Sequence, residues 1–270
     1  MIIPSKEHYT KFPNKFSQCD IRQKYGVSRK FYITYILIDK YRTIENYSWI
    51  TIKKILEFYG YKTTIRKPKA FREIIEVLEY MVSNKMIEIR QDLDSISYDT
   101  GIEVKILTDE FDCSNRWSKV TSSTINQIIH SESPLNKENL LLSFLYVNSF
   151  IGCRPKDELE NEQLENPTER PEAFYRNLHI MSKELAMSRE TVTKCMQCLV
   201  NEEILKKMIV GSVSKNNKLQ NVPHIYVLNK KGYEQEMEWA FLKMKKIYSV
   251  ESFAKQIQQE GDKKNNARNN

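Results

Sequence analysis

The chain has 270 residues, a length that allows two ordinary domains, each with its own core. Its hydrophobic content of 40% and charged content of 29% are typical of a soluble globular protein, and no apolar stretch reaches membrane-spanning length. The net charge of +7 favours an anionic partner. The N-terminal stretch lacks a signal-peptide pattern and the five cysteines are scattered, so we expect a cytoplasmic protein with reduced thiols and no membrane partner.

A first domain is predicted over residues 28–112, after a polar and aromatic N-terminal arm at 1–27 that packs against it. Apolar periodicity predicts helices at 29–41, 51–59 and 70–84, followed by strands at 86–90 and 102–107. The β-branched residues of the first helix also allow a strand there. Pro68 suits the first position of the third helix. That helix is predicted to turn an apolar face inward, made of Ile74, Ile75, Leu78, Met81 and Val82.

The second domain is predicted over residues 136–231, after a Ser/Thr-rich linker at 113–135 with a short helix near its end. It opens with an apolar core helix at 136–152. Residues 156–172 carry seven acids against two bases, together with two prolines. This composition favours an exposed loop, which is either a solvated spacer or an acidic flap that competes with DNA for the basic surface.

The pattern of residues 180–228 is typical of a helix, a tight turn, a second helix and two strands joined by a polar loop. Ser182 is predicted to cap the first helix and Ser188 the second. The second helix carries a stripe at helical spacing, formed by Val192, Cys195, Met196, Leu199 and Val200. Strands are expected at 207–213 and 224–228. This order predicts a winged helix-turn-helix, with its second helix in a major groove and its wing along phosphates; the alternative is a small α+β module without a nucleic-acid partner.

The same order of elements occurs twice in the chain. A shift of 117 residues superposes five residues of the first domain, Arg72, Ile75, Leu78, Val82 and Ile87, on Arg189, Val192, Cys195, Leu199 and Ile204. The agreement lies in pattern rather than identity. The predicted fold class is therefore α+β, mainly helical, with two winged helix-turn-helix domains in tandem.

A long C-terminal helix is predicted over residues 232–260, before a disordered tail at 261–270. Its apolar face is predicted to carry Met237, Ala240, Phe241, Met244 and Ile247. The helix either covers the second domain or pairs with another copy in a homodimer.

The predicted DNA-binding residues are polar or basic side chains on the exposed helix faces and loops. In the second domain they are Ser188, Arg189, Thr191, Thr193, Lys194 and Gln197 on the helix and Lys215, Asn216, Asn217 and Lys218 in the wing. In the first domain they are Arg66, Lys67, Lys69 and Arg72. There the helix also carries Glu73, Glu76 and Glu79, which repel phosphate. We therefore expect sequence readout from the second domain, and weaker phosphate contacts or a protein interface from the first.

The motifs of common enzyme classes are missing from the sequence. There is no Gly-rich P-loop, and the four histidines stand alone without metal-binding spacing. Cys195 and Cys198 form a C-x-x-C that lacks a second pair to complete a zinc site. We predict a non-enzymatic protein with no catalytic residues, no metal and no cofactor.

The segment SKELAMSRETVTKCMQCLVNEEIL with the strand HIYVL, and the weaker first copy TIKKILEFYGY…KAFREIIEVLEYMVSNKMIEI, carry a resemblance. They resemble the tandem winged-helix replication initiators and replisome organisers of plasmids, mobile elements and phages of low-GC Gram-positive bacteria. The resemblance covers about two thirds of the chain, and its motifs are generic to winged helices. It implies binding of double-stranded DNA at repeated origin sites and recruitment of replication proteins, including a helicase loader.

Three hypotheses for function remain open at this point. The first is an origin-binding initiator or replisome organiser, which direct repeats in the preferred DNA would favour. The second is a dimeric transcriptional regulator, favoured by an inverted repeat near a promoter. The third is a winged-helix protein–protein adaptor, favoured by the absence of salt-sensitive DNA binding.

Overall fold

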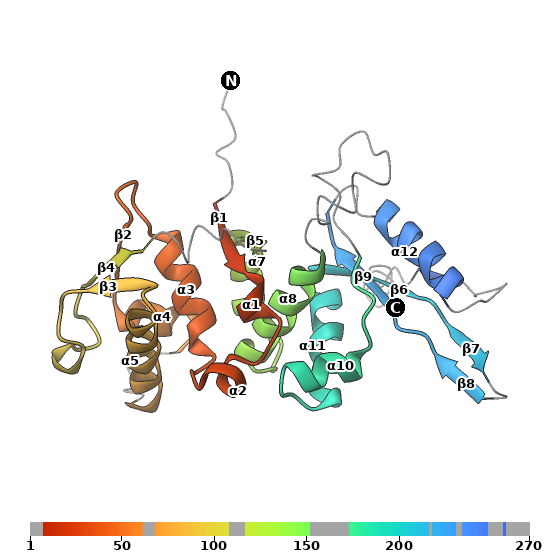
Figure 1. Cartoon of the computed structure of the whole chain (residues 1–270), viewed down its shortest axis with the longest axis horizontal. Helices are drawn as coiled ribbons and strands as arrows, with labels where there is room; N and C mark the ends of the chain where they lie inside the picture. Colours follow the sequence, from red (N-terminus) through yellow and green to blue (C-terminus); the bar gives the residue numbers. More distant parts are fainter. Residues whose placement is uncertain are drawn as a thin grey trace, which may run out of the picture. The chain divides into compact units, whose positions relative to one another are not determined.

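The structure is a computed structural model that describes residues 8–61, 68–107, 117–151, 173–215, 218–230, 234–247 and 256–257 (Figure 1). It confirms a mainly helical α+β protein with small antiparallel sheets. The chain divides into two compact units, which do not follow simple sequence order. Unit 1 comprises Met1–Ser149 and Glu184–Ala186, and unit 2 comprises Phe150–Lys183 and Met187–Asn270.

Unit 1 contains two small sheets and several helices. In chain order its elements are β1 (Tyr9–Pro13), α1 (Asn14–Ser17), α2 (Ile21–Tyr25), α3 (Lys30–Lys40), β2 (Tyr47–Ile50), α4 (Ile52–Phe58), α5 (Pro68–Ser83), β3 (Ile87–Ile89), the short 3-10 helix η1 (Leu93–Ser95), β4 (Ile102–Ile106), β5 (Trp117–Thr121), α7 (Ser122–Ile129) and α8 (Lys137–Ile151, whose last two residues belong to unit 2). The sheets have the strand orders β2-β4-β3 and β1-β5, and all pairs are antiparallel.

Helix α3 lies at the centre of unit 1 and is buried over nearly its whole circumference, which confirms the predicted helix and explains why apolar residues occur on all its sides. The residues before it are more ordered than the predicted arm, because β1, α1 and α2 add aromatic side chains to this core. The ring of Phe16 packs against that of Phe31 with centroids 4.8 Å apart, and the ring of Phe12 lies 5.1 Å from that of Tyr35.

Unit 2 has two helices followed by an extended hairpin and a covering helix. In chain order its elements are α10 (Leu178–Glu184), α11 (Arg189–Asn201), β6 (Leu205–Ile209), β7 (Ser212–Lys215), β8 (Lys218–Asn221), β9 (Ile225–Leu228), α12 (Glu234–Ile247) and β10 (Gln256–Ile257). The sheet order is β10-β6-β9, and Phe174 adds an isolated antiparallel bridge to Tyr226 on the other edge of β9.

The hairpin of unit 2 is longer than predicted and is interrupted once. The β6–β9 ladder gives way to the β7–β8 ladder near Gly211, whose φ of 107° favours glycine. Val222 closes the break by donating its N–H to the Gly211 carbonyl at 3.0 Å. The predicted single strand at 207–213 is therefore two strands with a bend.

Helix α12 packs its apolar face on the sheet of its own unit. Met237, Ala240, Phe241 and Met244 are buried in one cluster with residues of β6 and β9. Of the two predicted alternatives, the structure has the covering helix. The predicted helix to residue 260 is wrong at Gln256–Ile257, because these residues form β10 and pair with Ile209 and Met208 of β6.

The ends of α5 and α11 share one backbone geometry, at an offset of 118 residues rather than the predicted 117. Lys85 and Glu203 both have positive φ, 55° and 57°, directly after α5 and α11. The next residues repeat the same bond, from the Met86 N–H to the Met81 carbonyl at 2.9 Å and from the Ile204 N–H to the Leu199 carbonyl at 3.0 Å.

The corrected offset also aligns the buried faces of the two helices. Ile74, Val77, Leu78 and Met81 in α5 correspond to Val192, Cys195, Met196 and Leu199 in α11, and all eight are buried. The prediction placed Ile75 and Val82 inward and was wrong for Val82, which is 37% exposed. Successive residues of a helix are about 100° apart around its axis. An offset that is wrong by one residue therefore rotates the predicted buried face away from the observed one.

Candidate nucleic-acid interface

The α10–turn–α11 segment is fixed by two polar caps. The Asn177 side chain accepts the His179 N–H at 2.8 Å, so α10 begins several residues before the predicted cap. Ser182 lies inside α10 and is buried, and its Oγ donates to the His179 carbonyl. The prediction of Ser182 as a cap is therefore wrong. The turn passes through Ala186, at a φ of 47°.

Ser188 caps α11 as predicted, because its Oγ accepts the Thr191 N–H at 3.0 Å. Glu190 lies in the first turn, where the helix dipole favours an acid. The apolar side of α11 is buried as described above, with Cys198 added to it and Val200 at its margin. The opposite side of α11 is therefore its exposed side.

The exposed side of α11 contains Arg189, Thr193 and Lys194, whereas Thr191 and Gln197 are partly buried. Lys194 pairs with Glu190 one turn earlier at 2.6 Å, and the hydrogen bond and charge of Lys194 lower the pKa of Glu190. Both side chains are largely exposed, so this pair adds little stability.

Two further polar groups of α11 are engaged along the helix. Thr193 Oγ1 donates to the Arg189 carbonyl at 2.8 Å, and Gln197 Nε2 donates to Asn201 Oδ1 at 2.9 Å. Arg189 is exposed and has no ion pair with any residue that the structure describes. Of the predicted base-reading side chains, Arg189 is therefore the most readily available.

The hairpin of unit 2 brings basic residues to its tip and base. Lys215 and Lys218 are opposite each other in the β7–β8 register, on either side of Asn216 and Asn217, which lie outside the described residues. From residue 205 to residue 228 the chain has four lysines and no acid. The whole hairpin is therefore suited to an anionic surface.

His224 directly precedes β9 and is partly buried. Burial lowers its pKa, and the nearby charge of Lys207 lowers it further. Its ring therefore favours the neutral form near neutral pH, and the positive charge of the hairpin comes from lysine.

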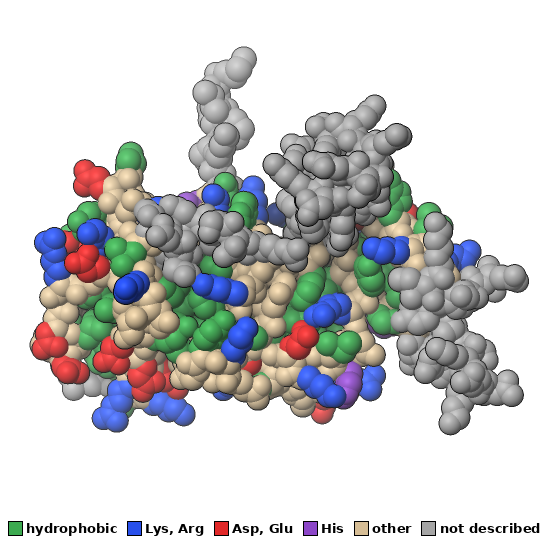
Figure 2. All heavy atoms as spheres, viewed as in Figure 1, with side chains coloured by type: hydrophobic (Ala, Val, Ile, Leu, Met, Phe, Trp, Pro, Cys, Tyr) green, Lys and Arg blue, Asp and Glu red, His purple; other side chains and the backbone are tan. Residues whose placement is uncertain are grey.

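The equivalent surface of unit 1 has the opposite charge. Lys69 and Arg72 are exposed on the first turns of α5, as predicted, but Glu76 and Glu79 follow them. From residue 87 to residue 106 the hairpin has five acids and two bases. Figure 2 shows acidic side chains over this part of unit 1. Arg66 and Lys67 lie outside the described residues, as does the acidic segment at 156–172.

Glu73 does not belong to the exposed face of α5. It pairs at 3.1 Å with Lys30, which is 4% exposed and also bonds Glu138. Lys30 Nζ further lies over the rings of Tyr59 and Tyr61, at 5.2 and 5.4 Å from their centroids. Burial would lower the pKa of Lys30, but the two carboxylates raise it. Glu73 is thus part of a structural cluster and adds no charge for a partner.

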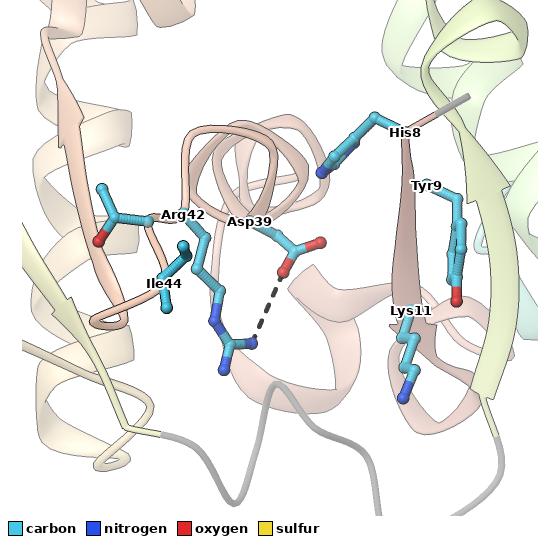
Figure 3. A pocket seen from close by; sticks show the side chains of 7 residues that line it. His8, Tyr9, Lys11, Asp39, Arg42 and Ile44 are labelled. Carbon is cyan, nitrogen blue, oxygen red and sulfur yellow. Dashed lines mark ion pairs between the residues drawn. The ribbon is translucent and has the colours of Figure 1, made fainter. Parts of the chain in front are cut away.

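Sequence reasoning missed a shallow hollow beside β1 (Figure 3). His8, directly before β1, and Lys11 of β1 line one side of the hollow. Asp39, at the end of α3, and Arg42, in the turn after it, line the other. Arg42 lies 3.9 Å from Asp39 and donates to Asn46 at 2.8 Å. β1 forms one wall of the hollow and pairs with β5. The paired residues are more than a hundred positions apart in the sequence, so no local pattern predicts this pairing.

Cys195 and Cys198 are both buried, and neither forms a disulfide. Across the described parts of the chain, no three His, Cys, Asp or Glu side chains are grouped so as to hold a metal ion. Among the helices in those parts, none has the length and apolar content needed to cross a bilayer.

In comparisons with known proteins, no family model matches the sequence, and no curated protein matches it either.

Proposed function

We propose that the chain contains two winged helix-turn-helix modules in tandem. The support is an order of elements that occurs twice: helix, strand, helix, helix, strand, strand. In unit 1 these are α3, β2, α4, α5, β3 and β4, and in the second copy α8, the bridge at Phe174, α10, α11, β6 and β9. In both copies the last strand lies between the other two.

The proposed function is non-enzymatic binding of double-stranded DNA, with α11 in a major groove and the β7–β8 hairpin along phosphates. The observation that supports this proposal is that one unit contains both features. It has an exposed helix face with Arg, Thr and Lys, and a hairpin with four lysines and no acid. Arg189 can address guanine, and the lysines supply phosphate contacts.

Within this function, we propose a replication initiator or replisome organiser of a mobile element, following the resemblance in the sequence. In the dimeric regulator the long C-terminal helix would serve as the dimer seam, and the apolar face of α12 is buried on its own sheet. The outer side of α12 does expose Trp239 and Leu242, at 39% and 54%. Recruitment of replication proteins stays a prediction.

Selection of sites from a random duplex pool, followed by fluorescence anisotropy at several salt concentrations, tests the proposal. We expect an enriched motif arranged as direct repeats and an affinity that falls steeply with salt. An inverted repeat would favour the regulator. No enrichment and no salt dependence would contradict DNA binding and favour the adaptor.

A further inference from the structure

The β1–β5 ribbon of unit 1 has a chemically unusual outer face. Its strands repeat one short motif, Tyr-Thr-Lys at 9–11 and Trp-Ser-Lys at 117–119. The alternate residues of both strands are buried against the unit, so the aromatic and lysine side chains share the outer face. Tyr9 is 40% exposed and Trp117 is 37% exposed. Neither strand contains an acid.

The antiparallel register sets these four side chains in a symmetric order. Lys11 is directly opposite Lys119, and Tyr9 and Trp117 lie two positions away from this pair on either side. At about 3.3 Å per residue, the two aromatic residues are roughly 13 Å apart along the ribbon. Each lysine lies over the ring of the other strand, with Lys11 Nζ 5.2 Å from the Trp117 ring and Lys119 Nζ 4.5 Å from the Tyr9 ring.

Two like charges directly opposite each other destabilise a strand pair. The rings under Lys11 and Lys119 offset part of this repulsion through cation–π attraction. An anion between the two lysines would offset more of it. The adjoining hollow holds the ion pair of Arg42 with Asp39, beside His8 (Figure 3).

We propose that this ribbon, made of Tyr9, Lys11, Trp117 and Lys119, binds single-stranded DNA. Each lysine moves from the ring beneath it to a phosphate, one base stacks on each ring in its place, and the phosphates between the two bases lie on the lysine pair. Exposed rings that alternate with cations are the means by which proteins bind single strands without reading their sequence, because every base has a stacking face. In a duplex the base faces are covered by their neighbours, so the rings have nothing to stack on.

The ribbon belongs to unit 1, whereas the proposed duplex surface belongs to unit 2. The inference therefore goes beyond duplex binding; only the choice of DNA over RNA rests on the proposed function. The two proposals also depend on different residues, so each can fail alone.

The test is fluorescence anisotropy of the full chain with labelled (dT)20, (U)20 and a random-sequence duplex over a salt series. Lys11→Gln with Lys119→Gln should weaken (dT)20 binding at least fivefold and lower the salt slope by about 1.4, because each lysine that neutralises a phosphate adds about 0.7 to the slope. Trp117→Ala should weaken (dT)20 binding about tenfold, because the variant has no ring for a base to stack on. Duplex binding should stay within about twofold in both variants.

Matched controls come from the same unit. Lys54, which lies 3.7 Å from the centroid of the Tyr41 ring, and Trp49, which is 57% exposed, are off the ribbon. Lys54→Gln and Trp49→Ala should leave (dT)20 binding unchanged, and circular dichroism checks that every variant is folded. The inference is overturned if (dT)20 does not bind at low salt, if the controls weaken binding as much as the ribbon variants, if Arg189→Ala removes (dT)20 binding, or if (U)20 binds more tightly than (dT)20.

Discussion

The two copies of the repeated element order have similar backbones and opposite surfaces. After α5, the chain leaves the helix through Lys85 at positive φ and enters a hairpin with five acids and two bases. After α11, it leaves through Glu203 at nearly the same φ and enters a hairpin with four lysines and no acid. The buried faces correspond residue by residue, whereas the exposed faces do not. The backbone is thus compatible with more than one partner, and the function has to be argued from the exposed side chains.

The largest expected effect is on unit 1, which depends on a buried ion pair. Arg29 is 4% exposed, and its Nη2 lies 2.9 Å from the Asp20 carboxylate and donates to the Leu185 carbonyl at 2.7 Å. Arg29→Ala leaves the Asp20 charge buried, so we expect a loss of about 3–5 kcal/mol in the free energy of unfolding. Denaturation followed by tryptophan fluorescence in a Trp239→Phe background reports on Trp49 and Trp117 of unit 1.

Arg22→Ala is the matched control, because Arg22 also pairs with Asp20, at 3.3 Å, but is 53% exposed. It should cost less than about 1 kcal/mol. Burial would raise the pKa of Asp20, but its hydrogen bonds and the charge of Arg29 lower it overall. The stability from the pair is therefore full above the unfolded pKa of about 3.9 and is lost as the pH falls through the lower folded value. An equal loss in both variants would contradict this assignment.

The next effect concerns base readout by unit 2. Arg189→Ala should lower the affinity for a selected site by about 1–3 kcal/mol and relax the preference at one base position. Arg72→Ala, on the first turns of α5, should change the affinity less than twofold, because Glu76 and Glu79 make that face unfavourable to phosphate. Anisotropy with the selected duplex and single-base variants measures both. If Arg72→Ala has the larger effect, the comparison between the units is reversed.

A smaller effect is expected from the hairpin of unit 2. Lys215→Ala with Lys218→Ala should weaken binding to all duplexes alike and reduce the salt slope by about 1.8, or about 0.9 for each phosphate that a lysine neutralises. Lys53→Ala with Lys105→Ala removes two lysines from unit 1 that pair with Asp99 and Glu88. That control should leave the slope unchanged, and a slope unaltered by the unit 2 variant would show that its hairpin does not lie on phosphates.

The smallest effect tests the acids of unit 1. Glu76→Gln with Glu79→Gln removes two exposed negative charges from α5, which should raise duplex affinity about twofold at low salt and have no effect at high salt. The measurement is again anisotropy at two salt concentrations. A fall in affinity would mean that these carboxylates contribute to binding.

Local signals in the sequence are sufficient to predict α11, because Ser188 and the apolar spacing after it act within a few residues. They misplace the start of α10, where Asn177 caps the helix and Ser182 bonds back to His179 inside it. The shift of 117 fails by one residue because it aligns residue types, whereas the helix ends at Lys85 and Glu203 define the backbone register.

Long-range pairing accounts for the other differences. The β1–β5 ribbon joins residue 11 to residue 119, and β10 joins residue 256 to residue 209, without any turn between them to predict the register. The two aromatic-x-Lys motifs are visible in the sequence, but only the register brings their lysines opposite each other. The candidate site on α11 was therefore predictable, and the ribbon was not.

We propose that unit 2, rather than the equivalent surface of unit 1, binds duplex DNA. Acetylation of lysines with and without a selected duplex, read by mass spectrometry, compares the two surfaces in one sample. We expect the duplex to protect Lys194, Lys215 and Lys218 and to leave the reactivity of Lys69 and Lys85 unchanged. Protection of Lys69 and Lys85 with unchanged reactivity of the unit 2 lysines would contradict it.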